Sequence, residues 1–248
     1  MSAKKMNKKI PLLIIAAIVL LAAVLWFATN RVGTAVELPD ETAAVSAEES
    51  VAVEAEQTGS QILLRDALLV QEIGSHTGPY WEDGSDEQVS DVLSMTVTNV
   101  TGEPIQYAQI TVELPNGAAS FTVTALPADA TAVLLETDRM AYDKSIDYGS
   151  VAVECQNLAG FDKPVSLQEQ KLQLQLLEGA LNITNISGEE IPGPIVLCYK
   201  NVENGIYLGG IGYRIRLEEG LKANEIRQIM ASHIHQPGTE LVFVQIGQ

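Results

Sequence analysis

The sequence predicts an all-β protein in which two tandem β-sandwich domains follow one N-terminal transmembrane helix and a disordered acidic linker. Three observations predict this architecture. Residues 10–28 form an uncharged run, residues 29–60 are acidic and contain no aromatic side chain, and a segment of the remaining chain occurs twice. Both copies of that segment alternate β-branched and polar residues, which is the pattern of half-buried strands.

The uncharged run at residues 10–28 predicts a transmembrane helix, because at about 1.5 Å per residue it spans about 28 Å, close to the hydrocarbon thickness of a bilayer. Residues 1–9 carry four lysines and no acid, so we expect them to stay in the cytoplasm while the rest of the chain is exported. The alternative is a signal peptide cleaved at small residues near Gly33, although its apolar region is usually shorter. Trp26 and Phe27 favour a retained anchor, since aromatic side chains gather at membrane interfaces.

Residues 29–60 are expected to form a disordered linker. Small residues and acids dominate them, so they offer too little apolar surface to offset the entropy of ordering, and their like charges extend the chain. A weak helix over residues 45–56 is the alternative, because Ala and Glu favour helix. In both cases the linker would hold the folded part away from the membrane.

An internal repeat divides the remainder of the chain into domain 1, residues 61–163, and domain 2, residues 164–248. We expect about six strands in each, at the spacing of a β-sandwich, and each domain is long enough for its own core. In residues 93–99 the odd positions Leu93, Met95 and Val97 are apolar and should face that core. The matched segments are Val97–Ile105 with Ile183–Ile191, and Leu126–Asp129 with Leu221–Asn224.

Glycines in two settings have predicted structural roles. Gly102 and Gly188 should supply the positive φ of tight turns that the side chains of Asn99 and Asn185 help to close. The segment Gly209–Gly212 is rich in glycine, but no helix follows that could direct its dipole at a phosphate. A β-bulge or a close contact between strands is therefore the better interpretation.

These patterns resemble a known family. An aliphatic strand, Asn-x-Thr/Ser-Gly, a second aliphatic strand and a Leu-Pro-Ala turn are similar to FxLYD-type and related immunoglobulin-like domains of bacterial cell-envelope proteins. The resemblance covers about 45 residues of domain 1 and less of domain 2. The family's signature is absent, because the matching strand reads Val112-Glu113-Leu114 in one copy and Cys198-Tyr199-Lys200 in the other. The resemblance implies immunoglobulin-like sandwiches outside the cytoplasm and carries over no functional residues.

Cys155 and Cys198 are the only cysteines. In an oxidising compartment an even number can indicate a disulfide. Both residues, however, continue inward-facing series of strands in different copies, so their Cα atoms should lie too far apart to be bridged. We therefore expect two buried free thiols.

The acidic composition excludes one class of partner. The chain contains 15 basic and 32 acidic residues, for a net charge of −17. A nucleic-acid partner is not expected, because it would require clustered Lys and Arg. We find no nucleophile elbow, zinc-protease motif, phosphate-binding loop or dinucleotide fingerprint, so we expect neither an enzyme nor a cofactor.

The segment Gly74–Glu87 is present in the first copy alone and carries the candidate binding residues Tyr80, Trp81, Asp83 and Asp86. Exposed aromatic rings beside carboxylates suit the binding of a protein or a sugar, and loops on a rigid sandwich are where binding residues concentrate. The alternative is a polar connection in which Trp81 folds back over the edge of the core.

His233 and His235 form an H-x-H pair that would project both imidazoles to one side of an extended strand, as some metal sites require. Two ligands do not make a site, so we treat them as a weak metal candidate and a structural pair as the better interpretation.

These observations predict a single-pass protein of the cell membrane with its C-terminal domains outside the cytoplasm. Its expected role is a non-catalytic module that binds a protein partner in the cell envelope or assists envelope assembly. The alternative role is binding of cell-wall glycan or a divalent cation through Trp81 with Asp83 and Asp86, or through His233 with His235.

Overall fold

The computed structural model describes residues 61–247. The predicted cytoplasmic segment 1–9, transmembrane helix 10–28 and linker 29–60 lie outside the described residues. Within the described range, no helix is both long enough and apolar enough to cross a bilayer.

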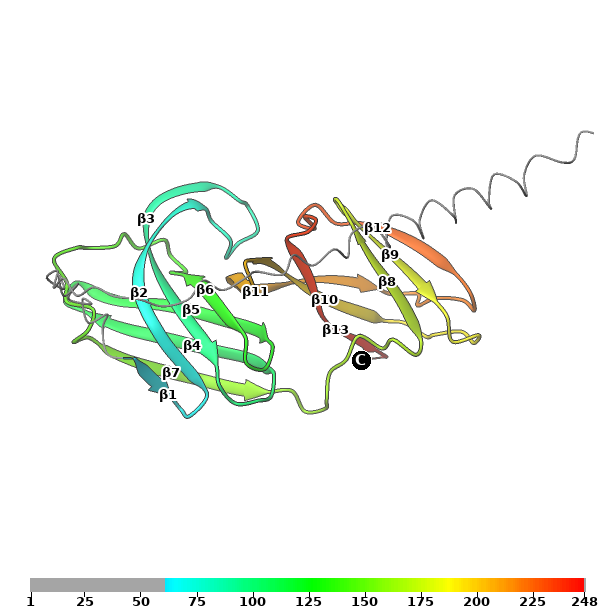
Figure 1. Cartoon of the computed structure of the whole chain (residues 1–248), viewed down its shortest axis with the longest axis horizontal. Coiled ribbons are helices and arrows are strands. Elements are labelled where there is room, and N and C mark those ends of the chain that lie inside the picture. Colours follow the sequence, from blue (N-terminus) through cyan, green and yellow to red (C-terminus); the bar gives the residue numbers. More distant parts are fainter. Residues whose placement is uncertain (1–60, 248) are drawn as a thin grey trace, which may run out of the picture. The chain divides into compact units, whose positions relative to one another are not determined.

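The described residues confirm the all-β prediction, and their strands are labelled in Figure 1. The strands are β1 (Ile62–Leu64), β2 (Leu68–Pro79), β3 (Gln88–Asn99), β4 (Ile105–Leu114), β5 (Gly117–Leu126), β6 (Thr131–Leu135), β7 (Ala152–Gly160), β8 (Leu172–Leu177), β9 (Ala180–Asn185), β10 (Ile195–Glu203), β11 (Ile206–Leu217), β12 (Ile226–Met230) and β13 (Thr239–Ile246).

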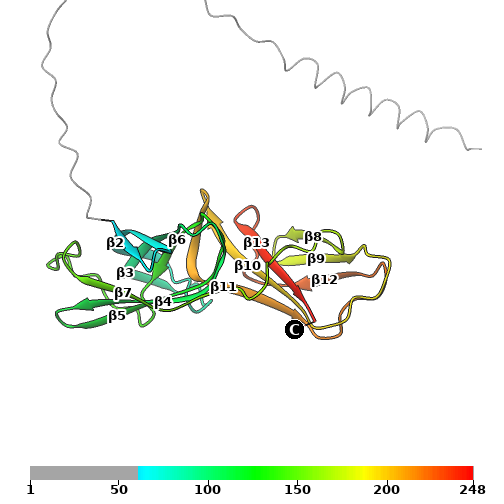
Figure 2. The same ribbon diagram turned by 90° about the horizontal axis from the view of Figure 1, so that it is seen from below.

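The strands form three sheets. One has seven strands in the order β1-β2-β3-β6-β11-β10-β13, and the others have the orders β5-β4-β7 and β12-β9-β8. In the first copy β2, β3 and β6 lie in one layer and β4, β5 and β7 in a second layer facing it (Figure 2). In the second copy β8, β9 and β12 face β10, β11 and β13.

Two hydrophobic clusters fill the spaces between these layers, one built mainly from β1 to β7 and one from β8 to β13. In β3 the predicted inward positions Leu93, Met95 and Val97 are all 0% exposed, which confirms the alternation. Full burial of each such side chain contributes about 1.5–3 kcal/mol to stability. Tyr207 of β11 packs into the first cluster, so the second copy supplies part of the first copy's core.

The repeated Asn anchors the same turn in both copies, as the sequence predicts. The amide nitrogen of Asn99 donates to the carbonyls of Glu103 (2.8 Å) and Pro127 (2.8 Å). Its side-chain oxygen accepts from the backbone N–H of Thr101 (3.1 Å). Asn185 repeats this network in the second copy, where Lys222 accepts at 2.9 Å. Both amides are 0% exposed, and such buried polar groups persist because their hydrogen bonds are satisfied.

One strand pairing joins the two copies into a continuous sheet. Strand β6 of the first copy pairs in parallel with β11 of the second, with Thr131 opposite Ile206 and Val133 opposite Leu208. The other strand pairs are antiparallel. The internal repeat alone does not predict this pairing, which places the start of β11 beside the loop that carries Trp81.

Candidate functional site

A groove of about 710 Å³ brings together three segments that are distant in the sequence. The loop between β2 and β3 contributes Trp81 and Asp86, and the hairpin between β10 and β11 contributes residues 201–205. The segment that leads into β13 contributes His235. The groove therefore gathers three of the residues that the sequence singled out, from both copies of the repeat.

Trp81 forms one wall of the groove and is half-buried. Its ring lies 4.4 Å from the ring of His76, measured between centroids. On its other side it packs so closely against β11 that a Cβ added to Gly209 would lie 2.9 Å from the Cβ of Trp81. Trp81 thus folds back against the sheet, as the structural alternative proposes, and still lines the groove.

The expectation that Tyr80 is exposed is wrong. Its side chain is 2% exposed, and its hydroxyl donates to the backbone carbonyls of Glu136 (2.9 Å) and Thr137 (2.8 Å). Burial, together with the nearby charge of Glu82, raises the pKa of Tyr80 to about 12. The sequence could not reveal this burial, because the two carbonyls that accept from the hydroxyl, and Leu135 in the same hydrophobic cluster, lie more than fifty positions away.

Asp83 does not line the groove, since its carboxylate pairs with Arg139 at 2.7 Å. Glu87 pairs with the same guanidinium at 2.7 Å, and the guanidinium carbon lies 4.4 Å from the ring centroid of Tyr80. Hydrogen bonds from Ser85, and then Arg139, lower the pKa of Asp83. Asp83 and Glu87 therefore fix this loop by pairing with the guanidinium of Arg139.

His233 and His235 do not face a common ligand, because they lie in a turn outside the strands and contact different partners. His233 stacks on Tyr213, with ring centroids 4.6 Å apart, and its Nδ1 lies 3.5 Å from the Asp86 carboxylate. His235 contacts Glu178 at 3.3 Å. Within residues 61–247, no three His, Cys, Asp or Glu side chains gather closely enough to hold a metal ion.

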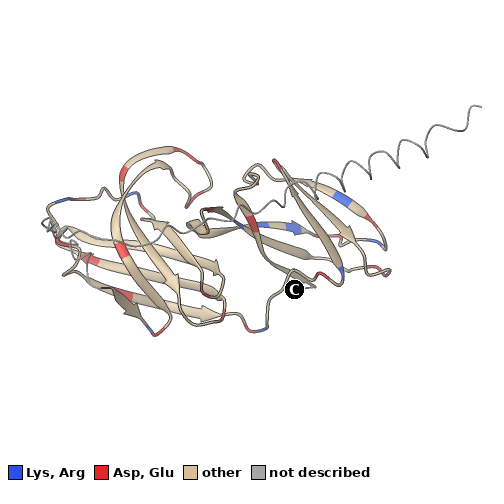
Figure 3. Cartoon of the chain, viewed as in Figure 1, with Lys and Arg blue, Asp and Glu red and all other residues tan. Residues whose placement is uncertain are grey.

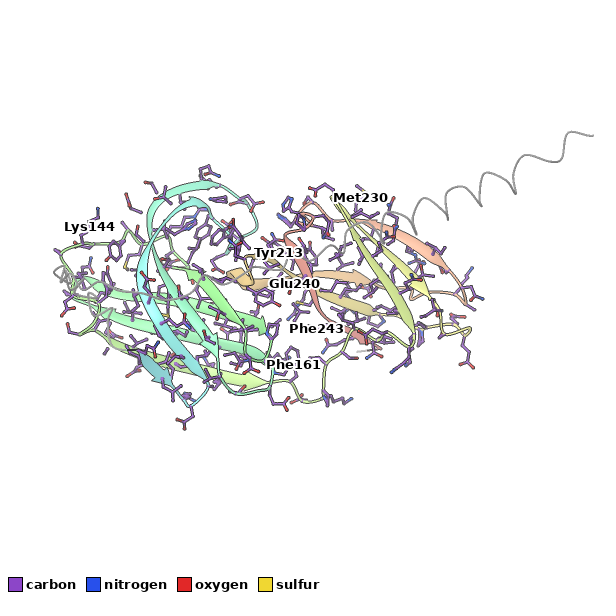
Figure 4. The ribbon with its side chains drawn as sticks, viewed as in Figure 1. Lys144, Phe161, Tyr213, Met230, Glu240 and Phe243 are labelled. Carbon is purple, nitrogen blue, oxygen red and sulfur yellow. The ribbon has the colours of Figure 1, made fainter. Side chains whose placement is uncertain are left out.

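The groove is acidic. Asp86, Glu203 and Glu240 line it with exposed side chains, and in the described part of the chain no Lys or Arg does so. Glu240 accepts a hydrogen bond from the hydroxyl of Tyr207 (2.9 Å), which fixes this carboxylate at the groove wall. Figure 4 labels Glu240, which lies in β13, and Tyr213, which lies in β11; β10 runs between these two strands. The site thus offers one aromatic face and three carboxylates to a ligand.

Behind the groove, Glu82 ties the loop to both copies. Its carboxylate accepts a hydrogen bond from the N–H of Leu135 in β6 (2.9 Å). It also accepts from the N–H groups of Gly210 (2.8 Å) and Ile211 (3.3 Å) in β11. Burial raises the pKa of Glu82, which these hydrogen bonds and the charge of Lys200 oppose. Sequence reasoning missed this residue, because an isolated Glu in a polar loop gives no signal of burial.

Lys200 is the counterpart of Glu82 and is 1% exposed. Its ammonium donates to the carbonyls of Gly210 (2.9 Å) and Ile211 (2.7 Å), and to that of Thr124 in the first copy (3.2 Å). Burial lowers the pKa of Lys200 to about 8, an effect that the charge of Glu82 opposes. The two charges therefore bind opposite sides of the same backbone segment.

The segment Gly209–Gly212 makes this arrangement possible and confirms the predicted bulge or close strand contact. A Cβ at Gly210 would collide with the carbonyl oxygen of Thr122 in β5, and one at Gly212 would lie 2.9 Å from the sulfur of Cys198. The register between β10 and β11 shifts here, so the segment bulges from the ladder. Its bulged backbone groups are the ones that Glu82 and Lys200 satisfy.

Cys155 and Cys198 are buried free thiols, as predicted. Cys155 belongs to the first hydrophobic cluster, whereas Cys198 packs with Ala125 and Phe243. Burial raises the pKa of Cys198 to about 11, so neither position is suited to a reactive nucleophile at neutral pH.

Comparison of this chain with protein-family models, curated proteins and solved structures finds no match.

Proposed function

We propose that the chain is a membrane-anchored extracytoplasmic protein whose two immunoglobulin-like β-sandwich domains bind another protein of the cell envelope without catalysing a reaction. The observation that carries this proposal is the acidic groove, in which Trp81 lies beside Asp86, Glu203 and Glu240. Pockets that bind partners combine an apolar platform with a few placed polar groups.

The chemistry of the groove favours a protein segment that carries Lys or Arg. A cation is attracted both to the face of an aromatic ring and to nearby carboxylates, and the two effects add when the groove excludes water. The neighbouring loop contains the same arrangement internally, since Arg139 lies over Tyr80 and pairs with Asp83 and Glu87. A basic side chain of a partner would find an equivalent setting beside Trp81.

Crosslinking in cells tests this proposal. Full-length chains with Trp81→Ala or Glu203→Arg should each lose the protein that formaldehyde links to the unsubstituted chain. Glu203 is exposed, so its substitution removes charge complementarity without disturbing the core. The matched control is Glu113→Arg, an exposed acid of β4 outside the groove, which should retain the partner. Equal recovery from all four chains would contradict the assignment of the groove.

Binding of a small ligand is the second candidate, and the exposed face that Trp81 presents to a groove of about 710 Å³ favours glycan over cation. A divalent cation is disfavoured because Asp83 is paired with Arg139, and Asp86 is left with His233 as its neighbour. Calorimetric titration of the full chain with cell-wall glycan fragments and with calcium chloride separates these cases. Saturable heat with glycan, absent in Trp81→Ala, would replace the protein partner by a sugar.

A further inference from the structure

Strand β12 presents an exposed apolar edge. Ile226 is 71% exposed and Met230 is 77% exposed, the highest values among the large hydrophobic side chains of the described residues. Between them Gln228 is also exposed, whereas Ile229 packs against the second hydrophobic cluster. Figure 4 labels Met230 at the end of this strand. Proteins normally protect such an edge, because it is a template for a further strand.

The backbone of β12 is hydrogen-bonded on one side, where it pairs with β9. The N–H of Asn185 donates to the carbonyl of Glu225 (2.9 Å), and the N–H of Ala231 donates to that of Gly179 (3.0 Å). Because paired and outward-facing backbone groups alternate along an antiparallel strand, these two bonds fix the phase. The backbone N–H and C=O groups of odd-numbered positions of β12 therefore point toward β9. Those of even-numbered positions point away from β9, out of the edge of the sheet.

The outward positions are therefore Ile226, Gln228 and Met230, the same residues whose side chains lie on the outer face. Among the described residues, their outward backbone groups have no strand to pair with. Exposed apolar residues, Ile226 and Met230, also lie two positions from Gln228 on either side.

In the first copy of the internal repeat, the edge equivalent to that of β12 is paired with a strand. In the first copy β6 follows the turn Leu126–Asp129, just as β12 follows the turn Leu221–Asn224 in the second. The corresponding edge of β6 is occupied, because Thr131 and its neighbours pair with β11. The second copy has no following copy among the described residues, so its equivalent edge is left open.

The outer face of the β12-β9-β8 sheet is uncharged, which favours self-association of an acidic chain. In Figure 3 the ribbons of β8 and β9 carry no charged segment, although the chain as a whole has a net charge of −17. Two copies of so acidic a chain repel one another across most surfaces, but not across an uncharged one. The outward side chains of the three strands, apart from the small and apolar ones, are Gln173, Gln175, Asn182, Thr184 and Gln228.

We propose that β12 pairs antiparallel with β12 of a second copy of this chain, about a two-fold axis at Gln228. In this register Gln228 lies opposite Gln228 of the second copy, and Ile226 lies opposite Met230. The outward N–H and C=O groups of all three residues are then satisfied, and the exposed apolar side chains pair across the axis. The two three-stranded sheets then form one continuous sheet across an isologous two-fold interface.

Disulfide trapping in the full-length chain tests this register. Directly opposed Cα atoms in a hydrogen-bonded pair lie about 5.5 Å apart, which is within the range of a disulfide. Cells that make Gln228→Cys should therefore yield a covalent dimer after mild oxidation. Ile226→Cys and Met230→Cys should yield a dimer when expressed together and none when expressed singly, because like positions lie about 14 Å apart in this register. Leu63→Cys, exposed on β1, is the matched control and should remain monomeric.

Each other outcome overturns the proposal. A Gln228→Cys chain that stays monomeric, or that links to a different protein only, excludes the two-fold pairing. A dimer from Ile226→Cys alone, at the level of the mixed pair, shows a parallel or random encounter. The native cysteines do not confuse this result, because both are buried.

A substitution without cysteine gives an independent measurement. Gln228→Pro removes an outward N–H and leaves the ladder with β9 intact, since proline is tolerated on an edge strand whose N–H faces solvent. The full chain should sediment as a dimer, and Gln228→Pro should sediment as a folded monomer. A monomeric unsubstituted chain, or a Gln228→Pro chain that remains dimeric and folded, contradicts the pairing.

Discussion

Replacing Lys200 by methionine should change how the stability of this protein depends on pH. Burial lowers the pKa of Lys200 from its ordinary value of 10.5 to about 8. Between these two values the unfolded chain binds a proton at this residue and the native chain does not, so stability rises with pH. A difference of this size corresponds to about 3 kcal/mol at about 1.36 kcal/mol per pH unit. Lys200→Met removes that contribution and should flatten this part of the profile.

The measurement is urea unfolding of both chains at intervals from pH 7 to pH 10.5, monitored by tryptophan fluorescence. The free energy of unfolding of the unsubstituted chain, minus that of Lys200→Met, should increase by about 3 kcal/mol across this range. Taking the difference reduces the opposing effect of Cys198, whose raised pKa makes stability fall between pH 9 and about 11. Lys144→Met, at an exposed lysine labelled in Figure 4, is the matched control and should follow the unsubstituted chain.

At pH 7 the same substitution should lower stability. It leaves the carbonyls of Gly210 and Ile211 without their charged donor and leaves the Glu82 carboxylate uncompensated, a loss of about 3–5 kcal/mol when one partner of a buried pair is removed. A difference profile that is flat with pH, or that falls as pH rises, would refute the reasoning that Lys200 is charged and buried.

Two further predictions concern the same region. Gly210→Ala should lower the free energy of unfolding by about 3 kcal/mol or more in urea titrations, because its Cβ would collide with the backbone of Thr122. Gly160→Ala, with no atom near the added Cβ, should leave the value nearly unchanged; equal effects would show that the close contact is absent. Cys198 should resist iodoacetamide at pH 8 in the native chain and react in urea, as mass spectrometry can check, because it is 0% exposed with a pKa of about 11. Rapid native labelling would contradict its burial.

Local patterns predicted much of this fold. The alternation in β3 identified its inward face, and Asn99 and Asn185 identified a turn that the structure repeats in both copies. Each of these features depends on residues close together in the sequence, or on a hydrogen-bonding amide whose role a turn motif already indicates. The close contact at Gly209–Gly212 was predictable for the same reason, since a run of glycines signals a backbone approach.

Long-range partners account for what the sequence did not reveal. Glu82 binds the backbone of Gly210 from 128 positions away, and nothing near either residue indicates it. Lys200 occupies a strand position where a lysine is normally assigned to the solvent. Trp81 and His235 line the same groove because β6 pairs in parallel with β11. Two independent β-sandwich domains, as the sequence predicts them, would not contain this pairing. Tyr80 was misjudged because the carbonyls that accept from its hydroxyl lie in the connection between β6 and β7.

The continuous sheet through β6 and β11 makes the two copies mutually dependent. Dividing the chain near residue 163 would remove β11 from the edge of β6. Glu82 would then face water in one fragment, and Lys200 would face water in the other. Tyr207 would be withdrawn from a core to which it belongs. The two copies are therefore not independent units, and truncation between them would leave two fragments that each lack contacts of the native fold.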